Sequence, residues 1–94
     1  MQEHHFKVLA PFASVADVLA STDGIAVLEA SELHRLCTLA GGAVVIVRPA
    51  YPDAVDVVVA EADEVADTVA HDLADRLAGL LGCEVSEPQP MGAA

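Results

Sequence analysis

Two apolar stretches decide the fold: AVVIV at residues 43–47 and AVDVVVA at residues 54–60. Short runs this rich in β-branched valine are typical of buried strands. The segment at residues 64–81 follows them and places apolar residues at helical spacing, with carboxylates on its opposite side. Two buried strands followed by an amphipathic helix indicate an α+β domain.

The chain is long enough for one domain with its own core. It has 94 residues, and area scaling predicts that about 64% of its surface is buried on folding. We assign residues 1–85 to a single globular domain. Residues 86–94 contain Pro88, Pro90 and a Gly-Ala-Ala end, and we expect them to form a flexible C-terminal tail.

Shorter signals predict the elements around this centre. Alternation predicts a strand at residues 5–10, and a capping-box pattern predicts a helix at residues 14–20. Residues 25–29 are predicted to form a second strand. Residues 83–85 are predicted to form an edge strand after the long helix.

A further helix is predicted after Ser31. Four apolar residues there fall at i, i+3, i+4 and i+7, and a glycine pair ends the series: Leu33, Leu36, Cys37 and Ala40, then Gly41 and Gly42. The predicted order is therefore β-α-β-α-β-β-α-β. We expect two to three helices over a four- to five-stranded mixed or antiparallel sheet.

The central strands are apolar on both faces, which raises the question of what covers each face. Val55, Val57 and Val59 lie on one face of the stretch 54–60, and Val58 and Ala60 lie on the other. A strand covered on one side only should alternate with polar residues. We expect a homodimer formed through the sheet. The alternative is a sandwich with helices on both faces.

A single carboxylate, Asp56, interrupts these strands. Such a carboxylate must lie at an exposed edge, be paired, or have a raised pKa, because burying an unpaired charge is costly. We expect an edge position. Catalysis usually needs several polar groups that converge in a cleft, and the predicted strands offer only this one. An enzyme is therefore the weaker hypothesis.

The charge balance excludes several classes of partner. The net charge is −11, and the four cations are scattered singly: Lys7, Arg35, Arg48 and Arg76. Nucleic acid and anionic membranes both require clustered cations, so neither is an expected partner. An acidic surface favours solubility or a basic protein partner.

The cysteines and the first residues bear on location and on metal binding. Cys37 and Cys83 are too far apart in sequence to form a zinc or redox motif, and the first ten residues lack an apolar signal segment. We expect a cytoplasmic protein with reduced thiols and no cofactor. His4 and His5 point to opposite sides if extended, so they cannot easily share a metal ion, and we expect a mobile N-terminus.

The outer face of the long helix carries the sharpest cluster of polar residues. Asp67, His71 and Asp75 follow at i, i+4 and i+8, so an imidazole lies between two carboxylates. These residues form a candidate site for a divalent metal ion, although a solvated acidic face explains the same pattern. The carboxylates should raise the pKa of His71 in either case.

Two other pairs were considered as sites. Arg48 and Tyr51 lie on a proline-rich loop predicted between the two apolar strands, and both residue types are frequent interface anchors. His34 and Cys37 resemble a base and nucleophile by residue type. Cys37 belongs to the apolar series, however, so we interpret it as a core residue.

These observations support three hypotheses of function. The first is a non-catalytic acidic interaction or accessory module that binds a larger protein through four residues: Arg48, Tyr51, Asp67 and Asp75. The alternative is a small-ligand or metal-binding regulatory domain that acts as a homodimer. The third is a small enzyme that uses Cys37 or His71.

Overall fold

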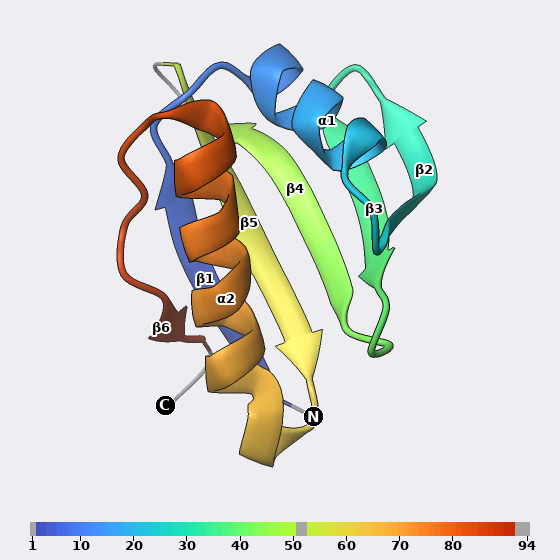
Figure 1. The fold of residues 1–94 in the computed structure, drawn as a ribbon, viewed down its shortest axis with the longest axis vertical. Helices are drawn as coiled ribbons and strands as arrows, with labels where there is room; N and C mark the ends of the chain where they lie inside the picture. The colour runs from blue at the N-terminus through green and yellow to red at the C-terminus, as the bar shows by residue number, and fades with distance from the viewer. Residues whose placement is uncertain (1, 51–52, 92–94) are drawn as a thin grey trace.

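A computed structural model describes residues 2–50 and 53–91, and it shows one antiparallel sheet with two helices on the same face (Figure 1). The elements are β1 (Gln2–Val8), α1 (Phe12–Ser21), β2 (Ile25–Ser31), β3 (His34–Leu39), β4 (Val44–Ala50), β5 (Ala54–Glu61), α2 (Asp63–Leu81) and β6 (Gln89–Pro90). The strand order is β2-β3-β4-β5-β1-β6. The α+β class is therefore confirmed, with six strands and two helices among the described residues.

The two apolar stretches form the central hairpin, β4 and β5. Val45 pairs with Val59 and Val47 with Val57, so these four side chains share one face of the sheet. β4 continues through Pro49 to residue 50, where a loop was predicted. Proline is tolerated there because the pairing of β3 with β4 ends at Val47, so the missing N–H breaks no bond to that strand.

The predicted helix at residues 31–40 is wrong: this segment is the strand β3, with a turn on each side. Cys37 faces the helices from β3, while Leu36 points to the other face. The glycine pair that was read as a helix end forms the β3–β4 turn instead. Leu39 N–H donates to Ala43 C=O at 2.9 Å, and Gly42 has φ +97°, a conformation that glycine adopts readily.

The long helix α2 is confirmed, and its packing face is made largely of alanine. Its buried residues are Ala66, Ala70, Leu73, Ala74 and Leu77. Helical spacing also puts Val65 and Leu80 near this apolar side, but they are 40% and 56% exposed. The helix therefore presents its smallest side chains to the sheet, which lets it lie close to the valines of β5.

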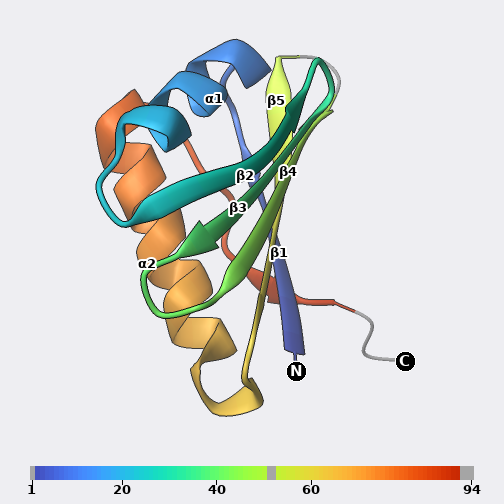
Figure 2. The same cartoon turned by 90° about the vertical axis from the view of Figure 1, so that its right-hand side faces the viewer.

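Both helices cover the same face of the sheet, as the side view shows (Figure 2). The core between them contains Phe6 from β1, the valines of β4 and β5, and Leu19 from α1. The alternative of a sandwich with helices on both faces is therefore wrong. Neither helix among the described residues combines the length and apolar character needed to cross a membrane.

The chain after α2 returns along β1. Leu9 N–H donates to Glu84 C=O at 3.0 Å, and Val85 forms an isolated bridge with Val8 where an edge strand was predicted. The edge strand is β6, which pairs with His4 and His5. Met91 N–H donates to Glu3 C=O at 2.8 Å, so the described chain follows β1 beyond residue 85, where a flexible tail was predicted to begin.

Two glycines near the end of α2 provide a matched test of its C-terminus. Gly82 ends the helix with φ +63°, whereas Gly79 lies within the helix, and an added Cβ would meet open space at both positions. We expect Gly82→Ala to lower the free energy of unfolding by about 1 kcal/mol, because alanine is strained at this φ. Gly79→Ala should raise it by roughly 0.5–1 kcal/mol through helix propensity. Urea denaturation of both variants measures these changes, and effects of the same sign would contradict the assigned helix end.

Candidate functional site

The sheet face away from the helices, here called the open face, carries an apolar row that crosses the central strands. His5 pairs with Val58, Val58 with Ile46, and Ile46 with Leu36, so the four side chains lie side by side. All four are only half-buried, because no described element covers them. The sequence predicts that both faces of the central strands are apolar, and this row is the second of those two faces.

A charged group lies beside the apolar row. Asp56 Oδ1 is 3.1 Å from His5 Nε2 and 4.0 Å from Lys7 Nζ, and Arg48 is its neighbour on β4. The predicted edge position of Asp56 is wrong, since β5 lies between β4 and β1. The carboxylate is instead accommodated by pairing, the second of the three options that the sequence allowed.

The open face is hollowed over this charged group. The hollow has a volume of about 360 Å³ and is lined by Glu3, His5, Ile46, Arg48, Asp56, Val58 and Met91. A histidine hydrogen-bonded to a carboxylate can act as a base. No Ser, Thr or Cys side chain is among the residues that line the hollow.

The residues predicted to bind a partner lie on different surfaces. Arg48 is exposed on the open face, whereas Asp67 and Asp75 are exposed on α2, behind the sheet. Tyr51 lies outside the described residues. The structure therefore separates Arg48 from the two carboxylates, and their role in binding a partner stays a prediction.

His4 and His5 belong to β1, so the expected mobile N-terminus is wrong at these positions. As predicted for an extended chain, their side chains point to opposite faces: His5 lies on the open face, and His4 is 3% exposed beneath the helices. His4 Nε2 lies 3.5 Å from Asp67 Oδ1, and its Nδ1 has no hydrogen-bond partner among the described residues. The strand predicted at residues 5–10 left His4 out, although the alternation extends back to residue 3 and was a signal that could have placed both histidines.

Asp67 therefore lies between two imidazoles. His71 Nδ1 is 3.3 Å from the same Asp67 Oδ1 and 2.9 Å from the Asp67 carbonyl oxygen. No group of three or more His, Cys, Asp or Glu side chains within the described residues is arranged to hold a metal ion. The metal set of Asp67, His71 and Asp75 stays a prediction.

The surroundings of His71 favour its protonated form. The hydrogen bond to the backbone carbonyl of Asp67 raises the pKa of His71 above its ordinary value. Partial burial opposes this shift, and the charges of Asp67, Glu87 and Asp75 add to it. The predicted rise is confirmed, although its largest cause is a backbone carbonyl and not a carboxylate.

Cys37 and His34 cannot act together. They stand three residues apart on a strand, so Cys37 faces the core and His34 faces the opposite side. Burial raises the pKa of the Cys37 thiol, and the nearby Arg35 charge offsets this only in part. Arg35 itself stacks on the Phe12 ring, 5.1 Å from its centre. The interpretation of Cys37 as a core residue agrees with this environment.

Comparison with known proteins adds no family: no family model, curated protein or solved structure matches this chain.

The pKa of His71 yields a test of the α2 surface. Because its folded-state pKa is raised, the stabilisation from protonated His71 is complete below the unfolded pKa of about 6.5 and is lost as pH rises through the folded pKa. We expect an NMR titration of His71 to give a pKa above the ordinary histidine value of about 6.5. Asp67→Asn should lower it, and Asp75→Asn should lower it less. A normal or depressed pKa in the unmodified protein would contradict the assigned contacts.

Thiol reactivity tests the burial of Cys37. Both cysteines are free, but Cys37 is buried while Cys83 is half-exposed. We expect a thiol reagent to modify Cys83 first and Cys37 only at the rate of unfolding. The thiolate is the reactive species, and burial both raises the pKa of Cys37 and keeps the reagent away from it. Mass spectrometry of the Cys83→Ser variant isolates the second reaction. Rapid modification of Cys37 without denaturant would instead support the enzyme hypothesis.

Proposed function

We propose that this chain is a non-catalytic interaction module that forms a homodimer by packing two open faces together. The observation that supports this proposal is the one-sided placement of the helices. It leaves the apolar row of His5, Val58, Ile46 and Leu36 without cover from any described element. Two such faces packed about 10 Å apart would remove both rows from water.

The charges of the chain favour the open face as the contact. At a net charge of −11, two copies repel each other over most of their surfaces. Around the hollow, however, Lys7 and Arg48 stand beside Glu3 and Asp56, so positive and negative charges balance. The open face is where two copies approach with the least repulsion.

The order of residues on β1 makes this strand complementary in charge to its own copy. Lys7 and Glu3 lie on the open face on either side of His5. A two-fold axis running along the apolar row exchanges these two positions between the copies. Lys7 of each copy then lies opposite Glu3 of the other, while the apolar row meets its own copy.

The size of the face predicts a weak dimer. Four strands spaced about 4.8 Å apart, each contributing roughly five residues, give a flat area of about 330 Å² per copy. Side-chain relief increases the accessible area, so the total buried lies near the lower limit of about 1,000 Å² for a specific interface. We therefore expect an equilibrium between monomer and dimer that depends on concentration.

In this dimer the helices face outward. The acidic residues on α2 that are exposed, among them Asp67 and Asp75, remain accessible on both sides. This arrangement suits a larger protein partner with a basic surface. The two free cysteines suit a reducing compartment such as the cytoplasm.

Sedimentation velocity over a range of concentrations tests the dimer. We expect Ile46→Asp to abolish it, because the substitution places like charges against each other in the apolar row. Leu80→Asp is the matched control: Leu80 is an exposed leucine on α2, far from the open face, and the dimer should persist in this variant. An unmodified protein that stays monomeric up to about 0.5 mM would exclude the proposal.

A charge exchange tests the two-fold arrangement itself. Lys7→Glu should weaken the dimer severalfold, since it places a carboxylate opposite Glu3 of the other copy. The double variant K7E/E3K should recover most of the lost affinity, because the complementary pair is restored with reversed signs. If the double variant is weaker than K7E, the two faces do not meet in this orientation.

A further inference from the structure

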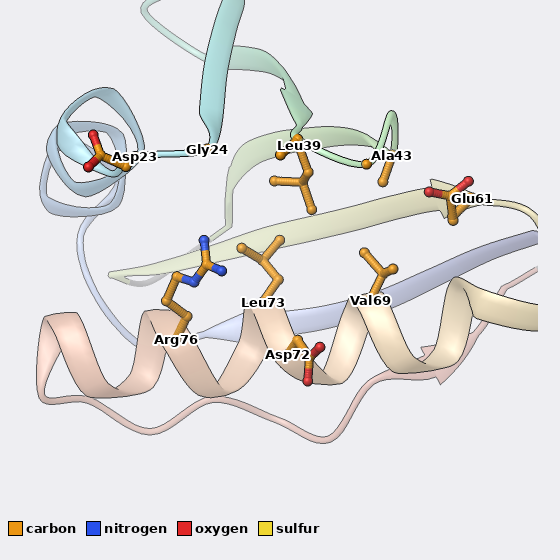
Figure 3. Close-up of a pocket in the computed structure, with 11 residues that line it drawn as sticks. Asp23, Gly24, Leu39, Ala43, Glu61, Val69, Asp72, Leu73 and Arg76 are labelled. Carbon is orange, nitrogen blue, oxygen red and sulfur yellow. The ribbon is translucent and has the colours of Figure 1, made fainter.

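A separate cleft lies on the helix side of the sheet, between α2 and the β3–β4 turn (Figure 3). Its volume is about 230 Å³. The cleft exists because the two helices differ in length: α1 has 10 residues and spans about 15 Å, whereas α2 has 19 and spans about 28 Å. The β3–β4 turn extends past the end of α1 (Figure 1), so the space beside α2 stays open there.

The middle of the cleft is apolar. Leu39 and Ala43 approach it from the sheet, and Val69 and Leu73 rise towards them from α2 (Figure 3). Leu73 and Ala43 are nearly fully buried, while Leu39 and Val69 are half-buried. A ligand that enters the cleft therefore meets aliphatic side chains on two opposite walls.

The two ends of the cleft carry opposite charges. The Arg76 guanidinium points from α2 towards the sheet at one end, and the Glu61 carboxylate lies at the other end, beyond Val69 (Figure 3). Glu61 Oε1 accepts the Ala62 N–H at 2.8 Å, which fixes its position. These two side chains are the polar groups that can define the orientation of a ligand.

Arg76 is available for a ligand in this arrangement. Asp72 stands four residues earlier on α2, a spacing at which helical ion pairs form, yet its side chain turns away from Arg76 (Figure 3). Asp23 on the rim also points outward. Across residues 2–50 and 53–91, Arg76 makes no ion pair within 4.0 Å.

We propose that this cleft binds a small linear ω-amino acid. The carboxylate of the ligand pairs with Arg76, its ammonium group pairs with Glu61, and its methylene chain lies between Leu39, Leu73 and Val69. Arg76 can donate two parallel hydrogen bonds to a carboxylate. A zwitterion suits the chain better than a simple anion, because a net charge of −11 repels anions from the cleft.

The volume of the cleft sets the size of the ligand. A five-methylene chain with a charge at each end has roughly nine non-hydrogen atoms, which fit a cleft of about 230 Å³. Such a chain can extend along α2 between Val69 and Arg76, over which the helix rises about 10 Å. The probe is therefore 6-aminohexanoate.

Titration of the unmodified protein with 6-aminohexanoate, followed by NMR of the backbone amides, is the primary experiment. We expect a dissociation constant in the millimolar range or tighter, with shifts at residues that line the cleft. Hexanoate and hexylamine, each lacking one charged group, should bind at least about 10-fold more weakly. Equal binding of hexanoate and 6-aminohexanoate, or no shifts at the cleft, would overturn the proposal.

Three variants assign the two ends. Arg76→Gln removes the partner of the ligand carboxylate, so the variant should bind 6-aminohexanoate no more tightly than hexylamine. Glu61→Gln removes the partner of the ammonium group, so this variant should bind 6-aminohexanoate no more tightly than hexanoate. Asp72→Asn is the matched control: it removes one rim carboxylate that points away, so the affinity should change less than about twofold. An Asp72→Asn effect as large as that of Glu61→Gln would show that only overall charge matters and would refute the two-ended site.

The proposed ligand site and the proposed dimer can fail separately. The cleft lies on the helix side and the dimer contact on the open face, so the monomeric Ile46→Asp variant should bind 6-aminohexanoate as well as the unmodified protein does. Circular dichroism of each variant confirms that it is folded. Loss of ligand binding in folded Ile46→Asp would place the probe at the open face and refute the cleft as its site.

Discussion

α2 lies on the sheet through alanines, and this contact determines how the rest of the chain is arranged. Ala66, Ala70 and Ala74 are buried on the side of α2 that packs against β1 and the valine-rich strand β5. Alanine lets the helix come close, and the β-branched side chains of the sheet fill the remaining space. A larger residue at one of these positions would strain the core by about 1–3 kcal/mol. The helix is thereby committed to one face of the sheet, and α1 completes the cover of that same face.

The open face is a direct consequence of that commitment. Among the described residues, no helix is left to cover Val58 and Ile46, although the sequence makes both faces of these strands apolar. An apolar row on a sheet that only water covers is unfavourable by roughly 25 cal/mol for each square ångström left exposed. The flanking charges lower the tendency to aggregate without covering the row, a pattern that agrees with the proposed dimer contact.

The sequence predicts correctly those elements whose hydrophobic pattern extends over many residues. The strands β4 and β5 and the helix α2 each show one period over many residues, and all three were predicted near their observed positions. Residues 31–40 fit two patterns. Leu33, Leu36 and Cys37 have helical spacing, whereas Arg35, Cys37 and Leu39 alternate with their neighbours as in a strand. The segment becomes a strand because it pairs with β2 and β4, and the residues that allow this pairing lie outside the segment.

The same distinction between local and distant contacts explains which site residues were found. Asp67 and His71 are one helical turn apart, so their contact could be predicted from spacing alone. The partners of Asp56 and His4 could not, because His5 and Asp56 are 51 residues apart and meet only through the insertion of β1 beside β5. Strand order is set by the path of the whole chain, and nothing in a single strand specifies its neighbours.

The chain has four cations and fifteen carboxylates. The positions of the cations therefore limit the surfaces on which it can bind a neutral or negatively charged ligand. At physiological salt, charges farther apart than about 8 Å are largely screened, so the balance within each surface matters more than the total. Arg35 is used within the fold, against the Phe12 ring. Around the hollow on the open face, Lys7 and Arg48 balance Glu3 and Asp56, and Arg76 is the cation that lines the cleft. These cations therefore lie at the two surfaces where we propose that a second copy of the chain or a zwitterion binds.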